Sequence, residues 1–349
     1  MRIAIVGAGA AGLAAAHALD VPVTVFEKSR GVSGRAATRW RDVVGPDGQP
    51  VRWRFDHGAQ YLSPEPESPA ADLIRQVLGD DLVEMDGAVW PFDDDGTLRP
   101  DRMRPPGLRW TLRDGIAELG RRLRDATPGL DLRQQRVVGL EPGDGWTLVT
   151  DDGARHGPFD AVVLTPPAPQ AAEIVGATDA RLAAALGRVA YRSQFTVVWG
   201  FDREVERPAA VYALVNADAH GGSGGGHDVA WLAVESDKPG RAPEGASIVL
   251  AQMSDRWTDR HYDAAQPEVV DAAAQAVAGL WGALPEPLWT DTQRWRYALP
   301  TGSLDADVQA EAAERGLWIA GDATAVQGRV HLALASGLAA AHAIRQRGT

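Results

Sequence analysis

Apolar and polar residues alternate in short blocks at the start of the chain. Residues 2–6 form an apolar run that ends in a glycine cluster, residues 10–19 are dense in small apolar residues, and residues 23–27 form a second apolar run. Runs of these lengths are typical of a strand, a helix and a second strand. A strand–helix–strand unit of about thirty residues holds its two strands parallel. The sequence therefore predicts an α/β fold with a parallel sheet.

The pattern becomes less regular over the next hundred residues. Residues 28–62 are rich in Arg and Gly and predict irregular structure, and a short helix is expected near residues 69–79. A helix is also predicted over residues 111–126, because apolar residues recur there at spacings of three and four. These are Leu112, Ile116, Leu119 and Leu123. Alternating stretches then predict strands at residues 130–140, 145–150 and 159–165.

A proline-rich segment at residues 165–169 cannot continue a central strand and predicts a crossing into a second domain. Apolar runs beyond it predict an antiparallel sheet, at residues 195–201, 210–216, 229–235 and 247–254. The glycine-rich run at residues 221–226 predicts a flexible loop between two of these strands. The remaining residues predict a helix, an extended segment, a strand and a helix, at 267–282, 288–299, 317–320 and 328–346.

Composition narrows the possible functions. The chain has 349 residues and a net charge of −12, so it is long enough for two domains and a large cofactor, and its acidity argues against nucleic-acid binding. It contains no cysteine, which excludes disulfides, thiolate metal sites and a flavin attached through a cysteine. No apolar run is long enough to span a membrane, and no secretory signal is recognisable. We therefore expect a cytoplasmic protein without a membrane or nucleic-acid partner.

A glycine motif lies between the first predicted strand and the first predicted helix. Gly7-Ala8-Gly9-Ala10-Ala11-Gly12 has dinucleotide-binding spacing, and Glu27 ends the next strand 20 positions after Gly7. Gly7 allows the tight turn, Gly9 lets the backbone approach a pyrophosphate, and Gly12 lets the helix pack on the strand. The helix N-terminus favours the anion, and Glu27 accepts hydrogen bonds from ribose hydroxyls. We predict a dinucleotide site here; the alternative is a tight turn without a ligand.

Two further segments indicate which dinucleotide it is. Gly34-Arg35, about eight residues after Glu27, resembles the second FAD motif of the flavin amine oxidase superfamily. The stretch 316–322, which ends in Gly321-Asp322 and precedes a helix with Ser336-Gly337, resembles the third motif, whose Asp contacts the ribityl chain or the pyrophosphate. The three motifs stand in family order and favour FAD over NAD.

The resemblance also implies an architecture. It predicts a discontinuous FAD-binding domain of the glutathione-reductase type, with a Rossmann-like parallel sheet, formed by residues 1–62, 108–165 and 290–349. An α+β substrate domain with an antiparallel sheet would comprise residues 63–107 and 166–289.

One branch of the superfamily is closer than the others. Gly34-Arg35-Ala36-Ala37-Thr38-Arg39 followed by Phe55-Asp56-His57-Gly58-Ala59-Gln60-Tyr61 resembles the renalases, as do the segments 295–298 and 328–330. The resemblance implies oxidation of dihydronicotinamide isomers of NAD(P)H, with hydride passed to the flavin and dioxygen reduced to hydrogen peroxide. The chain departs from the branch at His331-Leu332-Ala333, which puts the family substrate in doubt. His331 either contacts flavin or substrate or caps the helix.

These considerations give the candidate site residues. The predicted cofactor contacts are Gly7, Gly9, Ala10, Ala11, Gly12, Glu27, Lys28, Gly34, Arg35, Arg39, Val138, Gly321, Asp322 and Val330. The residues predicted to act at the flavin are Gln60, Tyr61, Tyr297 and His331. Trp295 is a further candidate for the flavin face, whereas Trp199 and Trp231 fit the core better; a surface role for Arg39 also stays open.

The chemistry of the electron donor leaves three functions open. Loss of hydride turns a dihydropyridine into an aromatic cation, so that donor needs no base, whereas an amine must also lose a proton. Amine oxidases of the superfamily commonly place a lysine and a water at the flavin, and neither Lys28 nor Lys238 lies in such a motif. We expect an oxidase of a small planar donor with dioxygen as acceptor. The alternatives are an amine oxidase or desaturase of secondary metabolism, and a non-catalytic FAD-bound redox sensor.

Overall fold

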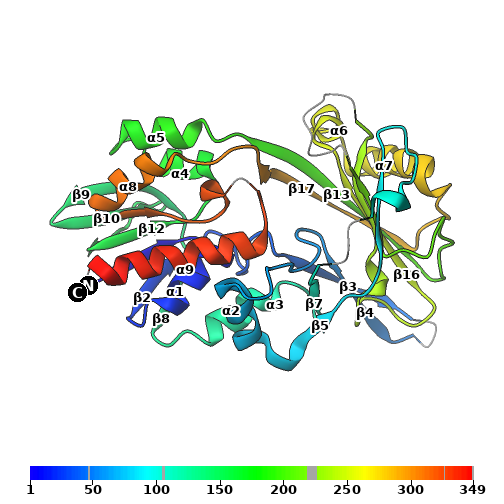
Figure 1. Ribbon diagram of the computed structural model, residues 1–349, viewed down its shortest axis with the longest axis horizontal. Helices are drawn as coiled ribbons and strands as arrows, with labels where there is room; N and C mark the ends of the chain where they lie inside the picture. The colour runs from blue at the N-terminus through cyan, green and yellow to red at the C-terminus, as the bar shows by residue number, and fades with distance from the viewer. Residues whose placement is uncertain (46–47, 104–106, 218–225, 326, 348–349) are drawn as a thin grey trace.

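The computed structural model describes residues 1–45, 48–103, 107–217, 226–325 and 327–347. A parallel five-stranded sheet forms one end of the molecule (Figure 1). Its strands, in spatial order, are β18 (Leu317–Ile319), β12 (Ala161–Leu164), β1 (Ile3–Val6), β2 (Val23–Phe26) and β8 (Leu130–Arg133). This is the predicted α/β unit, and the fold class is confirmed.

Both faces of the parallel sheet are covered, because side chains along each strand point alternately to its two faces. Ile3 and Ile5 pack on one face, whose helices are α1 (Ala10–Ala18), α2 (Pro69–Leu78), α3 (Glu118–Asp125) and α9 (Val330–Arg347). Ala4 and Val6 pack on the other face. The elements there are α4 (Ala168–Val175), α5 (Ala180–Gly187), α8 (Ala306–Glu314), β9 (Val137–Gly143), β10 (Gly145–Thr150) and β11 (Arg155–Phe159).

A six-stranded sheet forms the other end of the molecule. Its strands, in order, are β17 (Trp289–Pro300), β13 (Tyr191–Phe201), β16 (Ser247–Met253), β15 (Val229–Val234), β14 (Ala213–Asn216) and β6 (Val89–Phe92). Neighbouring strands are antiparallel except β14 and β6. One face packs against α7 (Gln266–Trp281) and Trp257 of α6 (Asp255–Arg260), and the long strands β13 and β17 reach back toward the parallel sheet (Figure 1).

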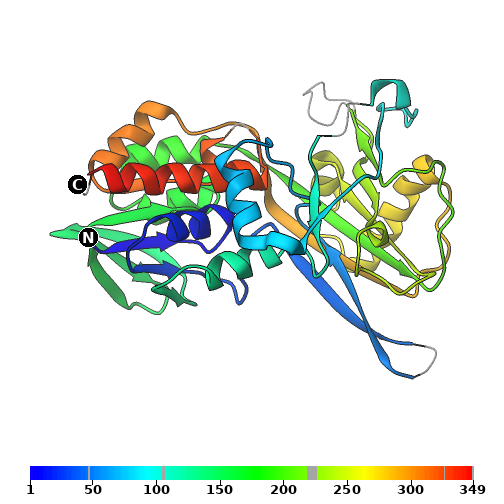
Figure 2. The same ribbon diagram turned by 60° about the horizontal axis from the view of Figure 1, so that its bottom comes forward.

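A β-hairpin covers the opposite face of the six-stranded sheet. β3 (Thr38–Val44) and β4 (Pro50–Asp56) pair antiparallel, and Trp53 and Phe55 pack against Trp289 and Tyr212. Figure 2 shows the hairpin extending away from the parallel sheet. The irregular structure predicted for residues 28–62 is therefore wrong over these two strands. Arginines and tryptophans alternate along both strands of the hairpin. This alternation is the sequence signal that could have predicted the two strands.

The helix predicted over residues 111–126 is wrong in its first half. β7 (Trp110–Leu112) pairs instead with β5 (Leu82–Glu84), and α3 begins only at Glu118, after a turn at Gly115.

 The φ angle of Gly115 is +104°, in the region that favours glycine. The four periodic apolar residues are all buried, but strand, turn and helix bury them in succession. Periodicity alone therefore identified buried positions and not the element that carries them.

The other predicted helices and strands are present, with ends shifted by a few residues, except that the single strand predicted at residues 130–140 is two strands, β8 and β9, in different sheets. The predicted loop at residues 221–226 lies outside the described residues except for Gly226. Four short 3-10 turns complete the elements, namely η1 (Gly79–Asp81), η2 (Pro100–Arg102), η3 (Glu235–Asp237) and η4 (Asp322–Thr324). In the described part of the chain, no helix combines the length and apolarity that a membrane span needs.

The division into two domains stays a prediction. The predicted substrate segments contribute β6 and most of the six-stranded sheet. They also contain α2, α4 and α5, which pack on the parallel sheet.

Candidate active site

A cavity of about 1520 Å³ lies between the two main sheets. Residues that follow β1 and β2 line it on one side, and side chains of β13, β14, β15 and β16 line it on the other. Sites for one small ligand are usually about 300–1,000 Å³. The cavity therefore has room for a dinucleotide and a second molecule.

The glycine turn opens into this cavity. Gly9 is the N-cap of α1 and offers no side-chain cap, so the first N–H groups of the helix face the cavity without an intrahelical acceptor. A Cβ at Gly9 would meet nothing nearer than the Cα of Gly34, at 4.0 Å. A Cβ at Gly12 would lie 2.0 Å from the carbonyl oxygen of Gly7, so Gly12 serves the packing of helix on strand and is not on the wall. The turn thus leaves an uncapped helix end with space in front of it.

Glu27 is held beside the turn by two backbone donors. Its carboxylate accepts hydrogen bonds from the N–H groups of Ala8 and Ser29, both at 2.7 Å. Lys28 donates to Gln170 at 3.1 Å, and partial burial lowers the pKa of Lys28 against the opposing charge of Glu27. Glu27, Lys28 and the half-exposed Val138 all line the cavity. The wall of the cavity near β2 is therefore polar, and Glu27 contributes an acidic group to it.

The second and third sequence motifs meet across the cavity. Arg35 donates to Asp322 at 2.6 Å and to the carbonyl oxygen of Tyr297 at 2.9 Å. Tyr191 donates to the other carboxylate oxygen of Asp322 at 2.9 Å, and burial together with Asp322 raises the pKa of Tyr191. Gly321 donates its N–H to Ser336 of α9. Gly34, Arg35, Gly321, Asp322 and Val330 all line the cavity.

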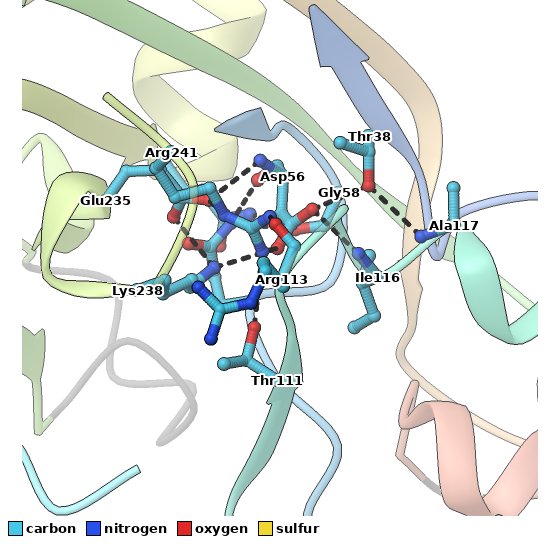
Figure 3. Close-up of polar contacts among 12 residues, drawn as sticks. Thr38, Asp56, Gly58, Thr111, Arg113, Ile116, Ala117, Glu235, Lys238 and Arg241 are labelled. Carbon is cyan, nitrogen blue, oxygen red and sulfur yellow. Dashed lines mark hydrogen bonds and ion pairs between the residues drawn. The ribbon is translucent and has the colours of Figure 1, made fainter. Parts of the chain in front are cut away.

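The segment 57–61 is fixed from below by a buried charge cluster, which comprises Asp56, Glu235, Lys238 and Arg241 (Figure 3). All four side chains are fully buried. Arg241 Nη2 lies 2.6 Å and Lys238 Nζ 3.0 Å from Asp56 Oδ2. Asp56 Oδ1 also accepts from Thr38 and from the N–H of Ile116. The cluster thus ties β4 and the start of α3 to the six-stranded sheet.

The two acids of the charge cluster differ in their electrostatics. Burial raises the pKa of Asp56, but the charges of Arg241 and Lys238 outweigh it and leave that pKa below its usual value. Burial raises the pKa of Glu235, and Lys238 does not fully offset it. Because two acids face two bases, the cluster is balanced when all four are ionised.

Hydrogen bonds from three directions hold the loop above the cluster. Gln60 Nε2 donates to the carbonyl oxygens of Asp56 at 2.6 Å and Gly58 at 3.1 Å, which turns its Oε1 away without a partner among the described residues. Gln252 donates to Gly58 at 2.7 Å. Trp295 donates to the carbonyl oxygen of His57 at 2.9 Å. The backbone of this loop is therefore rigid where it lines the cavity.

The four residues predicted to act at the flavin lie on the cavity wall, namely Gln60, Tyr61, Tyr297 and His331. Burial, followed by the charge of Arg329, lowers the pKa of His331, so its imidazole is neutral at pH 7. Trp295 and Trp231 join the wall, whereas Trp199 is fully buried in the core. This end of the cavity is aromatic, with amide and imidazole groups between the rings.

Arg39 is placed elsewhere. Its guanidinium pairs with Asp291 and donates to Gln293 at 2.7 Å, and it does not line the cavity. Arg39 is therefore not included among the residues proposed to hold FAD, and its cofactor contact stays a prediction. Two residues escaped the sequence analysis: Arg109, which lines the cavity, and Tyr191, which donates to Asp322. Their partners and neighbours lie far away along the chain, so no local pattern could have revealed them.

Neither lysine reaches the aromatic end of the cavity. Lys238 is sealed in the charge cluster, between Asp56 and Glu235. Lys28 lies beside Glu27 and bonds Gln170. The sequence contains no other lysine. A lysine therefore does not supply a base or a water ligand at this site.

Comparisons with known proteins agree with this geometry. The family model of flavin-containing amine oxidoreductases matches residues 77–345, and that of NAD(P)-binding Rossmann-like domains matches residues 5–77. Renalase from Mus musculus is 23% identical over 322 residues, which are 87% of this chain and 86% of renalase.

Solved structures share the fold. A protein from Exiguobacterium sp. 255-15, provisionally described as a protoporphyrinogen oxidase, has a TM-score of 0.77 and 18% identity and matches 99% of both chains. Putrescine oxidase bound to putrescine has a TM-score of 0.70 and 15% identity over 99% of this chain and 100% of its own. Reduced UDP-galactopyranose mutase has a TM-score of 0.73 and 12% identity over 99% of this chain and 94% of its own.

Fold and cavity together define a flavin-dependent oxidoreductase with FAD as its cofactor. The chain belongs to the family of flavin-containing amine oxidoreductases, and within that superfamily it is renalase-like. The family and the cofactor predicted from the sequence are thereby confirmed. The described residues fit FAD, because an uncapped helix end and a wall without a Cβ at Gly9 both face the cavity.

Proposed function

We propose that this chain is an oxidase of a small planar hydride donor, a dihydronicotinamide of the kind that the renalase resemblance implies, with dioxygen as the acceptor. Bound FAD would supply the hydride acceptor and pass the electrons on to dioxygen. The residues proposed to hold FAD are Gly7, Gly9, Ala10, Ala11, Glu27, Lys28, Gly34, Arg35, Val138, Gly321, Asp322 and Val330. Gly12 would act by packing α1 against β1.

The observation that carries the proposal is the position of the two lysines. An amine donor must give up a proton as well as a hydride, whereas a dihydropyridine gives up hydride alone and becomes an aromatic cation. Lys238 is paired with Asp56 and Glu235 inside the charge cluster, and Lys28 lies beside Glu27. A donor that needs no base fits this wall best.

The wall residues would then orient the donor and exclude water. Tyr61, Trp231, Trp295 and Tyr297 offer aromatic faces to a planar ring. Gln60 Oε1 is an unused acceptor, suited to an amide N–H of the donor. The lowered pKa of His331 favours its neutral imidazole, so His331 adds no positive charge beside the donor ring. Orientation, and not proton transfer, is the task of these groups.

Anaerobic mixing of the purified protein with candidate donors tests the proposal. Bleaching of the visible flavin band by aged NADH, which contains the dihydronicotinamide isomers, and not by putrescine or benzylamine is the expected result. Bleaching by an amine would instead favour the amine oxidase alternative, since those oxidases share the fold. Absence of bleaching with every donor would leave the non-catalytic redox sensor.

A further inference from the structure

Arg109 carries a buried positive charge that no carboxylate of the described residues pairs with. Its side chain is 7% exposed and lies on the wall of the cavity. Among the described residues, no carboxylate lies within ion-pair distance of its guanidinium, and its Nε has no hydrogen-bond partner. Guanidinium groups do not deprotonate in proteins, so the charge persists. Burial of an unpaired charge is strongly unfavourable, so a bound anion would stabilise this side chain.

Two other arginines on the same wall are paired: Arg35 with Asp322, and Arg102 with Asp93. The remaining arginines of the wall, Arg136, Arg296 and Arg329, are exposed, so water solvates their charges. Asp86, the wall carboxylate nearest to Arg109 along the chain, is exposed and forms no ion pair with it. Arg109 therefore stands out on this wall because it is buried and has no ion-pair partner among the described residues.

The position of Arg109 is fixed by the fold. Its carbonyl oxygen accepts from the N–H of Met85 at 2.9 Å, at the point where β5 and β7 pair. Its guanidinium lies 5.9 Å from the ring centre of Tyr61, and the ring of Tyr61 lies 5.9 Å from that of Trp231. Trp231 Nε1 is also a buried donor, and it has no hydrogen-bond partner among the described residues. Two unused donors, on Arg109 and Trp231, thus flank the ring of Tyr61. Tyr61 is one of the residues predicted to act at the flavin.

We propose that Arg109 is a specificity-determining residue that binds an anionic group, a carboxylate or a phosphate, on the substrate. A guanidinium binds either oxyanion through two parallel N–H groups, and the aromatic wall of Tyr61 and Trp231 fits the planar part of the same molecule. The inference deepens the proposed function, since it adds a negative group to the planar donor. Its binding test does not require that any donor react.

Three benzene derivatives separate the charge from the ring. Benzoate supplies a carboxylate, phenyl phosphate supplies a phosphate, and benzamide is the neutral control. Each is titrated into the FAD-loaded protein, and binding is followed by the perturbation of the flavin spectrum. We expect at least one anion to bind more tightly than benzamide, and Arg109→Met to weaken that anion roughly 10- to 100-fold while benzamide is unchanged. The preferred anion identifies the group.

Two variants control the result. Arg102→Met removes a guanidinium that is already paired on the same wall, and it should leave anion binding within about twofold of wild type. Arg109→Lys keeps the charge but loses the paired N–H groups, so it should lie between wild type and Arg109→Met. If Arg109→Met does not retain FAD, Arg109→Lys tests the inference in its place.

The inference is overturned if wild-type protein binds neither anion more tightly than benzamide. It is equally overturned if Arg109→Met and Arg109→Lys bind the anions as wild type does. Failure of every dihydronicotinamide to reduce the flavin would contradict the proposed function alone, because the equilibrium titration would still report on Arg109.

Discussion

Gly9 leaves open the space that the pyrophosphate of FAD would occupy. The protein itself tolerates a side chain there, because the nearest atom to a Cβ is 4.0 Å away. Gly9→Val should therefore fold but lose FAD, with the ratio of visible to protein absorbance at least about tenfold below that of wild type. Gly31→Val is the matched control, since nothing lies within 4 Å of a Cβ at Gly31. A Gly9→Val protein that purifies fully yellow would contradict the assigned site.

His57 makes stability depend on pH. Its ring stacks on Trp295, and burial, followed by the charge of Arg39, lowers the pKa of His57 to about 4 from 6.5. The unfolded chain then binds more protons between pH 4 and 6.5, so this contribution to stability is complete above pH 6.5 and is lost as the pH falls toward 4. The loss amounts to about 3 kcal/mol.

Thermal unfolding of wild type and His57→Phe checks this prediction. Phe keeps an aromatic ring against Trp295 but cannot take up a proton. Between pH 6.5 and pH 4, the melting temperature of His57→Phe should fall less than that of wild type, because only wild type takes up a proton at residue 57. The acids titrate in both proteins and therefore cancel in the comparison. Parallel curves for the two proteins would refute the contribution of His57.

Single residues show what the sequence reveals and what it does not. Gln60, Tyr61, Tyr297 and His331 were found because they lie within or beside family motifs. Arg109 lies in no motif, and its importance follows only from the absence of a carboxylate near it once the chain is folded. Burial and pairing of charges are tertiary properties, so sequence alone does not give them.

The charge cluster joins elements that are far apart in the sequence. Asp56 ends β4, whereas Glu235 begins η3 and Lys238 follows it. Removal of one member leaves an unbalanced buried charge, so Lys238→Met should destabilise the protein by about 3–5 kcal/mol. The double variant Glu235→Gln, Lys238→Met restores neutrality and should be more stable than Lys238→Met alone, as thermal unfolding would report.

The exposed pair of Arg207 and Asp237 provides the control for this prediction. It lies at η3, close to the charge cluster along the chain, but both side chains are about one-third exposed. Arg207→Met should therefore cost no more than about 1 kcal/mol. If Lys238→Met were as mild as Arg207→Met, the charge cluster would not hold these elements together.

Elements were predicted best where one period dominates. The first strand–helix–strand unit and the strands β13 to β17 of the six-stranded sheet lie where their patterns indicated, whereas β6 was not predicted. The segment 110–125 was not resolved correctly, because β7, the turn at Gly115 and α3 each bury apolar residues that together imitate a helix. The hairpin β3–β4 was missed although Arg and Trp alternate along it, because the side that carries Trp53 and Phe55 is buried only against Trp289 and Tyr212 of the sheet it covers.

At the level of the whole molecule, the cavity is a product of both sheets. The motifs predicted its dinucleotide side, where the segments after β1, β2 and β18 bring Gly9, Glu27 and Asp322 to one wall. The opposite wall comes from β13–β16 and could not be predicted, because its strands carry ordinary core residues. The family and cofactor therefore follow from the sequence, whereas the donor depends on a wall that only the fold assembles.

The central claim is that the donor gives up hydride without a base. Its most direct test is the rate constant for anaerobic flavin reduction by aged NADH, measured in a stopped-flow instrument from about pH 6 to pH 9. Arg109 stays charged, and the lowered pKa of His331 favours its neutral imidazole, so the account predicts a rate constant that does not rise with pH. A rate constant that rises about tenfold per pH unit would reveal a required base and contradict the account.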